Sequence, residues 1–300
     1  MTEKPVIVVA GATGALGQKM VSALAGHPCH VRALVRPGRS MPPRLFPPGT
    51  EIVPVALDDH SRLTWACREA QTVISTLSGL RETIDEGQRT LLDAAVEAGV
   101  SRFIPSDFSI GFDQVPPGSN RNVDLRREFG RILDSAPIHA TSIFNGSFET
   151  LLLTSGPFVI YPARRVLYWS SPDHPLDFTH MDDVARFTAA AALDLSAPRY
   201  LHIASARLTA RRIAETCFAV SGRAFKLIRG GDIRRMARLG AIFRKFLPQK
   251  NNPFSLWQGM QYLKNMHDPA QTLPPLDNDR YSGTVRRGAQ DIIAEHYAAG

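Results

Sequence analysis

The chain has 300 residues, of which 44% are hydrophobic, so it can bury a sizeable core as one large domain or two modest ones. The formal net charge of +7 suits acidic or phosphorylated partners. Three widely spaced cysteines (Cys29, Cys67 and Cys217) exclude a disulfide framework and a CxxC metal motif, so they predict structural thiols in a reducing compartment.

The start of the sequence leaves no room for a signal peptide, because a strand-like apolar run begins at Val6. No apolar run approaches the length of a membrane span. These features predict a soluble, cytoplasmic protein with no membrane contact and no metal site.

Apolar strand-like runs alternate with helical patterns through the first half of the chain. The expected strands are Val6–Ala10, His30–Val35, Ile52–Val55, Thr72–Leu77, Arg102–Pro105 and Ile138–Phe144. The expected helices are Leu16–Leu24, Leu63–Ala70, Ile84–Ala98, which Gly99 should end with a left-handed cap, and Val123–Leu133. Regular β-α alternation predicts an α/β fold, a Rossmann-type doubly wound parallel sheet with helices on both faces.

Beyond about residue 147 the pattern loosens, and proline and glycine become frequent. Acidic residues at 182–183 favour a helix start there, and further elements are expected in the order strand, helix, strand, helix: Tyr200–Ala204, Leu208–Val220, Phe225–Arg229 and a basic segment over 231–250. We therefore predict a Rossmann domain over residues 1–147 and a smaller C-terminal α/β region over 148–300, with 177–205 returning to the Rossmann core.

The stretch GATGALG, residues 11–17, lies between the first expected strand and the first expected helix. In that context Gly11 permits a tight turn, Gly14 lets the backbone approach a pyrophosphate, and Gly17 lets helix and strand pack closely. The helix N-terminus then offers N–H groups to the phosphates. The alternative is a plain strand-to-helix turn.

The end of the second strand indicates which dinucleotide such a turn would bind. It carries Arg36 and Arg39 and no carboxylate, whereas NAD sites usually place Asp or Glu there for the ribose 2′-hydroxyl. A guanidinium can bind a 2′-phosphate with two donors, so NADP(H) is favoured over NAD(H). The alternative is a pair of exposed, solubilising arginines.

Several segments in order resemble the NmrA-like and isoflavone-reductase-like branch of the atypical short-chain dehydrogenases/reductases. They are VIVVAGATGALGQKMV, LVRPG, ALDDHSRL, TVISTLSG, SRFIPSDF, IHATSIFNGSF and DFTHMDDVARF. The resemblance implies a Rossmann domain that carries NADP(H), with a substrate cleft between it and the smaller C-terminal region.

The resemblance also implies positions for the site residues. Those expected at the pyrophosphate are Gly11, Thr13, Gly14, Ala15, Leu16 and Gly17. The others are Arg36 at the 2′-phosphate with help from Arg39, Asp58 near the adenine, Ser75 and Thr76 beside the nicotinamide-side ribose, Ser106, Asp107 and Phe108 in the cleft, and Asn145 at cofactor or substrate.

The catalytic pattern departs from that of ordinary short-chain enzymes, because no tyrosine has a lysine four residues later. Reductases of the isoflavone-reductase type use a lysine on the helix before the sixth strand, and Arg126 stands at that position. An arginine stays protonated, so Arg126 is expected to hold ribose hydroxyls or polarise a carbonyl oxygen rather than move a proton. The alternative is a surface cation paired with Asp124 or Glu128.

The proton would then come from Asp107, Tyr168, His180 or bulk water. His180 precedes the helix that opens at Asp182, in a region that faces the cleft in the family. We therefore consider a substrate-contacting or proton-donating role for His180, with a structural histidine as the alternative.

The segment 231–250 is basic and amphipathic. Its cations are Arg234, Arg235, Arg238, Arg244, Lys245 and Lys250, with apolar residues every three or four positions between them. The favoured interpretation is a helix over the substrate cleft with a solvated basic face; a partner, nucleic-acid or membrane surface is the alternative. No helix-turn-helix or zinc-finger pattern supports specific nucleic-acid binding.

These observations predict an NADPH-dependent reductase that transfers hydride to a small, aromatic or otherwise apolar carbonyl or enone substrate. The alternative is a catalytically weak or inactive NADP(H)-binding redox sensor that reports to a protein partner. A homodimer is compatible with either function, and the sequence names neither the substrate nor the pathway.

Overall fold

The computed structural model describes residues 4–298 except 43, 154–156, 247–248 and 250–251. The chain forms two compact units. The first comprises residues 1–108, 125–143 and 184–201, and the second comprises 109–124, 144–183 and 202–300.

The first unit is built on a six-stranded sheet in the order β3-β2-β1-β4-β5-β6. Its strands are β1 (Val6–Ala10), β2 (His30–Val35), β3 (Glu51–Pro54), β4 (Ala70–Ser75), β5 (Arg102–Ile104) and β6 (His139–Ala140). All five neighbouring pairs are parallel. This is the strand order of a Rossmann sheet, so the predicted fold class is confirmed.

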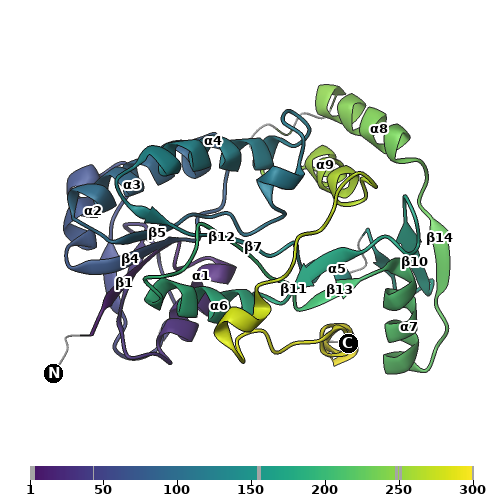
Figure 1. Cartoon of the computed structure of the whole chain (residues 1–300), viewed down its shortest axis with the longest axis horizontal. Helices are drawn as coiled ribbons and strands as arrows, with labels where there is room; N and C mark the ends of the chain where they lie inside the picture. Colours follow the sequence, from purple (N-terminus) through teal and green to yellow (C-terminus); the bar gives the residue numbers. More distant parts are fainter. Residues whose placement is uncertain (1–3, 43, 154–156, 247–248, 250–251, 299–300) are drawn as a thin grey trace. The chain divides into compact units, whose positions relative to one another are not determined.

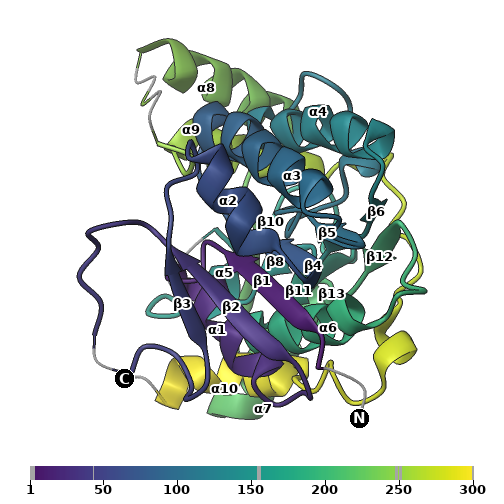
Figure 2. The same cartoon turned by 90° about the vertical axis from the view of Figure 1, so that its left-hand side faces the viewer.

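Helices cover both faces of this sheet. They are α1 (Ala15–Leu24), α2 (His60–Cys67), α3 (Gln88–Glu97), α4 (Arg121–Ser135) and α6 (Met181–Leu193). Figures 1 and 2 show α2, α3 and α4 on one face and α1 and α6 on the other. Val73 and Phe103 of the sheet pack with Leu63 of α2 and Leu91 of α3, all fully buried, and these contacts form the core under the first face.

The predicted strand Ile138–Phe144 is wrong in one respect, because the chain changes partners in its middle. Its first part is β6, and its second part is β7 (Ser142–Phe144), which pairs with β12 (Tyr200–His202) in a separate two-stranded sheet. The Thr141 N–H donates to the Phe103 carbonyl over 3.1 Å, whereas the next N–H, of Ser142, donates to the Arg199 carbonyl over 2.8 Å. Periodicity cannot register such a change of partner.

The helix expected over Ile84–Ala98 is also divided. A π-helical turn over Glu82–Gly87 leads into α3, and Gly99 follows with a φ of +75°, as the predicted left-handed cap requires. The π-helical turn holds no expected site residue, and α3 begins with Gln88, which is fully buried. This glutamine becomes part of the site described below.

The second unit contains two three-stranded sheets, β14-β10-β9 and β13-β11-β8. Their strands are β8 (Ser147–Phe148), β9 (Val159–Ile160), β10 (Arg165–Tyr168), β11 (Leu176–Thr179), β13 (Ala206–Leu208) and β14 (Lys226–Arg229). Its helices are α5 (Thr150–Leu153), α7 (Ala210–Ser221), α8 (Ile233–Phe246), α9 (Leu256–Met266) and α10 (Ala289–Ala298), with 3₁₀ turns over Phe112–Gln114 and Asn278–Tyr281. Phe158 packs edge-on against Phe178 and Trp169 in its core.

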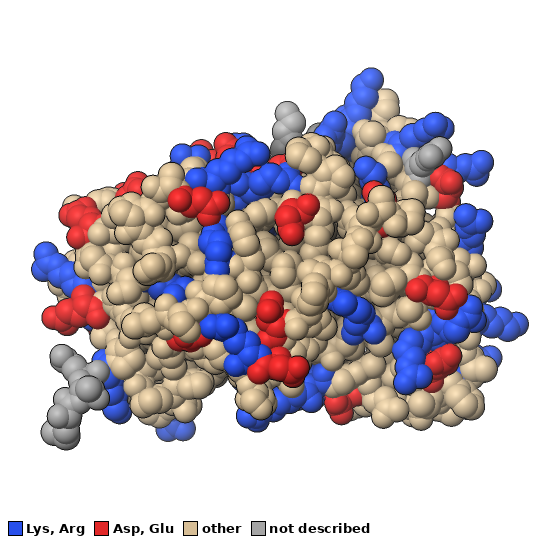
Figure 3. All heavy atoms as spheres, in the orientation of Figure 1, with Lys and Arg blue, Asp and Glu red and all other residues tan. Residues whose placement is uncertain are grey.

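The basic segment forms α8, which packs against α9, and Figure 3 shows Lys and Arg side chains gathered where α8 lies. Lys250, named above with this segment, lies outside the described residues. In the part of the chain that the structure covers, no helix combines the length and the hydropathy needed to cross a bilayer. All three cysteines are free thiols.

Candidate functional site

The glycine turn connects β1 to α1 at the carboxyl end of β1. Gly11 has a φ of +75°, and the Gly14 N–H donates to its carbonyl over 2.9 Å. A Cβ on Gly11 would lie 2.9 Å from the Thr76 carbonyl carbon, and one on Gly17 would lie 2.8 Å from the Ala12 Cα. Each of these glycines therefore allows a close approach that a larger residue would prevent.

The N-terminus of α1 faces the same edge of the sheet. Gly14 has an extended backbone (φ −75°, ψ 166°), and no side chain caps the helix among the described residues. The first turn also holds no acidic residue. N–H groups of a first helical turn have no partner within the helix, so this end presents donors and a positive dipole end to an anion.

The turn after β2 carries the two predicted phosphate ligands. The Arg39 N–H donates to the Arg36 carbonyl over 3.3 Å, and Gly38 between them has a φ of +71°. With Pro37 before that glycine, the sequence and geometry are typical of a type II turn. Both arginine side chains are exposed, and neither forms an ion pair or a hydrogen bond with any residue that the structure describes. Asp58, expected near the adenine, is also exposed.

Ser75 is the last residue of β4, the neighbour of β1, and Thr76 follows it. The Thr76 N–H and Oγ1 both donate to the Ala10 carbonyl, over 2.9 and 2.8 Å, so Thr76 ties the two strands together. Ser75 is fully buried, and its Oγ has no hydrogen-bond partner among the residues the structure describes. A buried hydroxyl without a partner is uncommon in native proteins and calls for a ligand or another explanation.

Ser106, after β5, joins three segments by hydrogen bonds. Its N–H donates to Gln88 Oε1 over 2.9 Å, and its Oγ donates to the Leu77 carbonyl over 2.6 Å. Its carbonyl accepts from Arg126 Nε over 2.9 Å. Ser106 therefore holds the backbone of the loop after β5 in place, and its hydroxyl proton is already donated to a backbone carbonyl.

Arg126 projects from α4 to the carboxyl end of β5, where the Ser106 carbonyl holds it. Each of the two carboxylates suggested as its surface partners contacts at least one further group. Glu128 pairs with Arg81 at 3.0 Å, and Asp124 accepts from the Gly118 N–H at 3.1 Å. The guanidinium charge is thus held at the edge of the sheet that carries the glycine turn.

Asp107 is fully buried at the head of a hydrogen-bonded chain. The Ser142 hydroxyl donates to Asp107 Oδ2 over 2.6 Å, and Arg199 Nη1 donates to the Ser142 oxygen over 2.6 Å. Arg199 Nε pairs with Asp134 at 2.7 Å. Burial raises the pKa of Asp107, while the Ser142 hydrogen bond and the charges of Arg126 and Arg199 oppose the rise. Asp107 Oδ1 has no partner among the described residues.

Asn145, in the second unit, has a fixed backbone and an unpaired side chain. Its N–H donates to the Ser109 carbonyl over 3.1 Å, and its carbonyl accepts from Thr179 Oγ1 over 2.6 Å. The side chain is fully buried, and neither its Oδ1 nor its Nδ2 has a partner within the described part of the chain. An amide in this position is available to a ligand.

His180 lies in a cluster of carboxylates within the second unit. Its Nδ1 accepts the Asp182 N–H over 3.2 Å, so the other ring nitrogen carries the proton in the neutral form. That Nε2 lies 3.1 Å from Glu295 Oε1 and 3.9 Å from Glu149 Oε1. Burial raises the pKa of Glu149, and the charge of His180 opposes this. Across the described residues, no group of three His, Cys, Asp or Glu side chains is placed to hold a metal ion.

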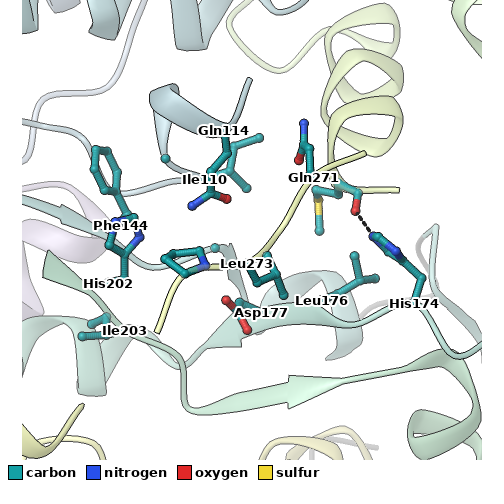
Figure 4. Close-up of a pocket in the computed structure, with 14 residues that line it drawn as sticks. Ile110, Gln114, Phe144, His174, Leu176, Asp177, His202, Ile203, Gln271 and Leu273 are labelled. Carbon is teal, nitrogen blue, oxygen red and sulfur yellow. Dashed lines mark hydrogen bonds between the residues drawn. The ribbon is translucent and has the colours of Figure 1, made fainter. Parts of the chain in front are cut away.

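A narrow pocket opens within the second unit, with a cavity of about 30 Å³, room for one or two waters. Figure 4 shows apolar side chains around it, together with His202, Gln114 and Gln271. Its lining consists of Ile110, Gly111, Gln114, Phe144, Gly146, His174, Leu176, Asp177, His202, Ile203, Met266, Gln271, Leu273 and Pro274. His180 is not among them.

Two polar groups of this pocket are held in defined states. Burial lowers the pKa of His202, whose ring lies 5.1 Å from that of Phe144, so the imidazole is neutral at pH 7. Asp177 is paired with Arg207 through two hydrogen bonds of 2.7 and 3.0 Å. The pocket therefore offers a mainly apolar surface with few polar contacts.

Several residues of the site carry no sequence signal. Gln88 and Ser142 contact the loop after β5, and Arg199 contacts Ser142, across chain separations that no motif spans. His202 lies in a strand that reads as core, with nothing to mark it as part of a pocket. Only their contacts in three dimensions identify them.

The chain matches the family model described as the NmrA-like family over residues 3–239. It is 27% identical over 267 residues to bifunctional pinoresinol-lariciresinol reductase 1 of Linum usitatissimum, a match covering 79% of this chain and 85% of that protein. Its fold is that of the Vitis vinifera leucoanthocyanidin reductase–NADPH complex (TM-score 0.77, 18% identity, 98% and 99% of the two chains). AtPrR2 with NADP⁺ and (+)pinoresinol is also similar (TM-score 0.71, 19% identity, 99% and 100% covered).

Proposed function

Because this chain belongs to the NmrA-like family, we propose that it is an NADPH-dependent reductase that transfers hydride to a small, apolar or aromatic carbonyl or enone. The observation that carries the proposal is the pair of orphaned polar atoms, Ser75 Oγ and Asp107 Oδ1, among the described residues. Ser75 ends β4 and Asp107 follows β5, so both lie at the carboxyl edge of the parallel sheet, where doubly wound folds bind their ligands. The reductases to which the chain is similar support the same activity.

The residues at this edge fit a dinucleotide carrying a 2′-phosphate. The close backbone approaches at Gly11 and Gly17 and the uncapped start of α1 suit a pyrophosphate. The two exposed arginines after β2, Arg36 and Arg39, suit the additional phosphate. When bound, NADPH supplies the hydride, and the remaining tasks fall to the protein.

Arg126 has the task of stabilising charge. Its position at the carboxyl end of β5 lets a permanent cation attract an acceptor oxygen as negative charge develops on it. It releases no proton at physiological pH. Asp107 is enclosed and receives the Ser142 hydrogen bond, and His180 is engaged with carboxylates, so we assign the proton to solvent water.

The pocket of Figure 4 supports a small, mostly apolar substrate. Its apolar side chains would contact an apolar group of the substrate no larger than the one or two waters that the cavity of about 30 Å³ can hold. His202 and Gln271 would supply hydrogen bonds, since Gln271 Nε2 is buried without a partner within the described residues. Asn145, flanked by the lining residues Phe144 and Gly146, adds an unpaired amide. We also propose a cytoplasmic location, which the three free thiols support.

The test is NADPH oxidation, followed at 340 nm, with a panel of aldehydes, ketones, enones and quinones. We expect turnover with at least one apolar substrate, and a loss of about 10²-fold in kcat in Arg126→Ala, the typical effect of removing one charge-stabilising group. NADP⁺ affinity should change little. Arg131→Ala, an exposed arginine on the same helix, is the control and should keep full activity. Equal kcat in the two variants would remove Arg126 from the mechanism.

An NADP(H)-binding redox sensor is the second candidate, because the hydroxyl that could donate a proton is held in another contact. Tyr161, the one tyrosine with a cation four residues on, donates its hydroxyl to the Leu152 carbonyl over 2.6 Å, and burial raises its pKa above the usual range for a tyrosine. A sensor would bind NADP⁺ tightly, turn over no member of the panel, and bind a partner protein differently with oxidised and reduced cofactor. That result would displace the reductase proposal.

A further inference from the structure

A second pocket lies on the surface of the second unit, with a cavity of about 280 Å³. It is formed by the turn between β9 and β10, the loop before β14 and the last turn of α10. Its lining consists of Tyr161, Pro162, Arg164, Arg223, Phe225, His296 and Tyr297. None of these residues belongs to the glycine turn or to the pocket of Figure 4.

The aromatic wall of this pocket is held in place by hydrogen bonds. The rings of Tyr161 and His296 stack with centroids 3.4 Å apart. The Tyr161 hydroxyl donates to the Leu152 carbonyl, and His296 Nδ1 lies 2.7 Å from the Leu153 carbonyl, which can only accept. Tyr297 meets Tyr161 edge-on at 5.8 Å. The wall is therefore preorganised before any ligand arrives.

Two arginines at this pocket carry charge without a counter-ion. Arg164 and Arg223 are exposed, and neither side chain has an ion pair or hydrogen bond anywhere in the described chain. The lining contains no Asp or Glu. The pocket thus combines an aromatic surface with positive charge that is not neutralised locally.

The backbone of Arg164 supports a role for its side chain. Its φ is +50°, a left-handed conformation that favours glycine and is costly for a residue with a side chain. Two backbone hydrogen bonds hold this conformation. The Arg164 N–H donates to the Tyr161 carbonyl, and the Arg164 carbonyl accepts from the Lys226 N–H. A guanidinium therefore occupies a position at which glycine would be more stable.

We propose that this pocket binds a small planar aromatic anion, a single ring that carries a phosphate or a carboxylate. The ring packs on the aromatic wall, and the anionic group accepts hydrogen bonds from the two guanidinium groups. The cavity suits one ring with one acidic group and is too small for a dinucleotide. This site is independent of the proposed reductase activity.

The experiment is calorimetric titration of the full chain with phenyl phosphate and with benzoate, in the presence of saturating NADP⁺. We expect at least one probe to bind with a Kd below about 5 mM, as contact of one ring and one anion allows. Phenol and inorganic phosphate, which each lack one half of the ligand, should bind about tenfold more weakly or not at all. The better of the two probes identifies the acidic group.

Three variants test the assignment. Arg164→Gly removes the guanidinium and relieves the left-handed strain, so its Tm should not fall while the Kd rises about tenfold. Arg223→Gln should weaken binding by a similar factor. Arg165→Gln, an exposed neighbour that does not line the pocket, is the control and should bind as the natural chain does. Absence of binding by both probes, or binding equal in all three variants, overturns the proposal.

Discussion

The turn after β2 gives the sharpest prediction about the cofactor. Replacing Arg36 with alanine removes a guanidinium that is exposed and has no ionic partner among the described residues. The replacement should therefore change the affinity for a ligand and leave the stability of the fold unchanged. The 2′-phosphate distinguishes NADP⁺ from NAD⁺. We therefore expect weaker NADP⁺ binding with NAD⁺ binding unchanged.

The magnitude follows from the exposure of both arginines. Two unit charges about 4 Å apart attract by about 1 kcal/mol in water and about 4 kcal/mol near a less polar surface. An exposed side chain lies toward the lower end, so each arginine should contribute about 1–2 kcal/mol, or roughly 5- to 30-fold in Kd. The double variant with Arg39→Ala should lose roughly 100-fold, because in the proposed complex both guanidinium groups would contact the same phosphate.

The assay is fluorescence or calorimetric titration with NADP⁺ and NAD⁺ at low and high salt. Salt should weaken NADP⁺ binding to the natural chain more than to the double variant, because exposed charges are screened. Arg68→Ala is the matched control: this exposed arginine lies just before β4, at the amino end of the sheet. Equal losses for both dinucleotides, or a loss as large in Arg68→Ala, would contradict the assignment of the turn.

Three further outcomes are expected. Gly17→Ala should lower the Tm and abolish dinucleotide binding because its Cβ would lie 2.8 Å from the Ala12 Cα, whereas Gly259→Ala, with nothing within 4 Å, should leave the Tm equal or higher. Burial raises the pKa of Asp107 above its unfolded value of about 3.9, so the free energy of unfolding should fall as the pH rises through the folded pKa. In urea denaturation at a series of pH values, Asp107→Asn should not show this fall. The same fall in Asp107→Asn would assign the pH dependence to another group. Iodoacetamide labelling followed by mass spectrometry should modify half-buried Cys29 first, because burial raises the pKa of the other two thiols to about 12; faster labelling of either would contradict their enclosure.

The sequence predicts the sheet well because its signals are local. Short apolar strands, a glycine turn between strand and helix, and the cap at Gly99 each depend on residues a few positions apart. The strand bounds of β1 and β2 follow directly from this pattern. The elements of the second unit are harder to predict from the sequence, because strands such as β8 and β9 have two residues each and show no periodicity.

The sequence predicts a residue of the candidate site only where its residue type and its position along the chain together indicate one function. Arg126 can be placed by counting from the sixth strand, but its Ser106 acceptor is a carbonyl, which every residue has. The hydrogen-bonded chain from Arg199 through Ser142 to Asp107 depends on folding that joins segments 35 and 57 residues apart. Polar groups of this kind read as surface residues until the packing is known.

The bond between Arg126 and Ser106 has a consequence for how such a protein diversifies. The acceptor is the main chain, so a change of side chain at position 106 leaves it in place. The Gln88 amide likewise holds the N–H of Ser106 rather than its hydroxyl. Substitutions at 106 can therefore adapt this position to new ligands during evolution while the cation beside it keeps its anchor.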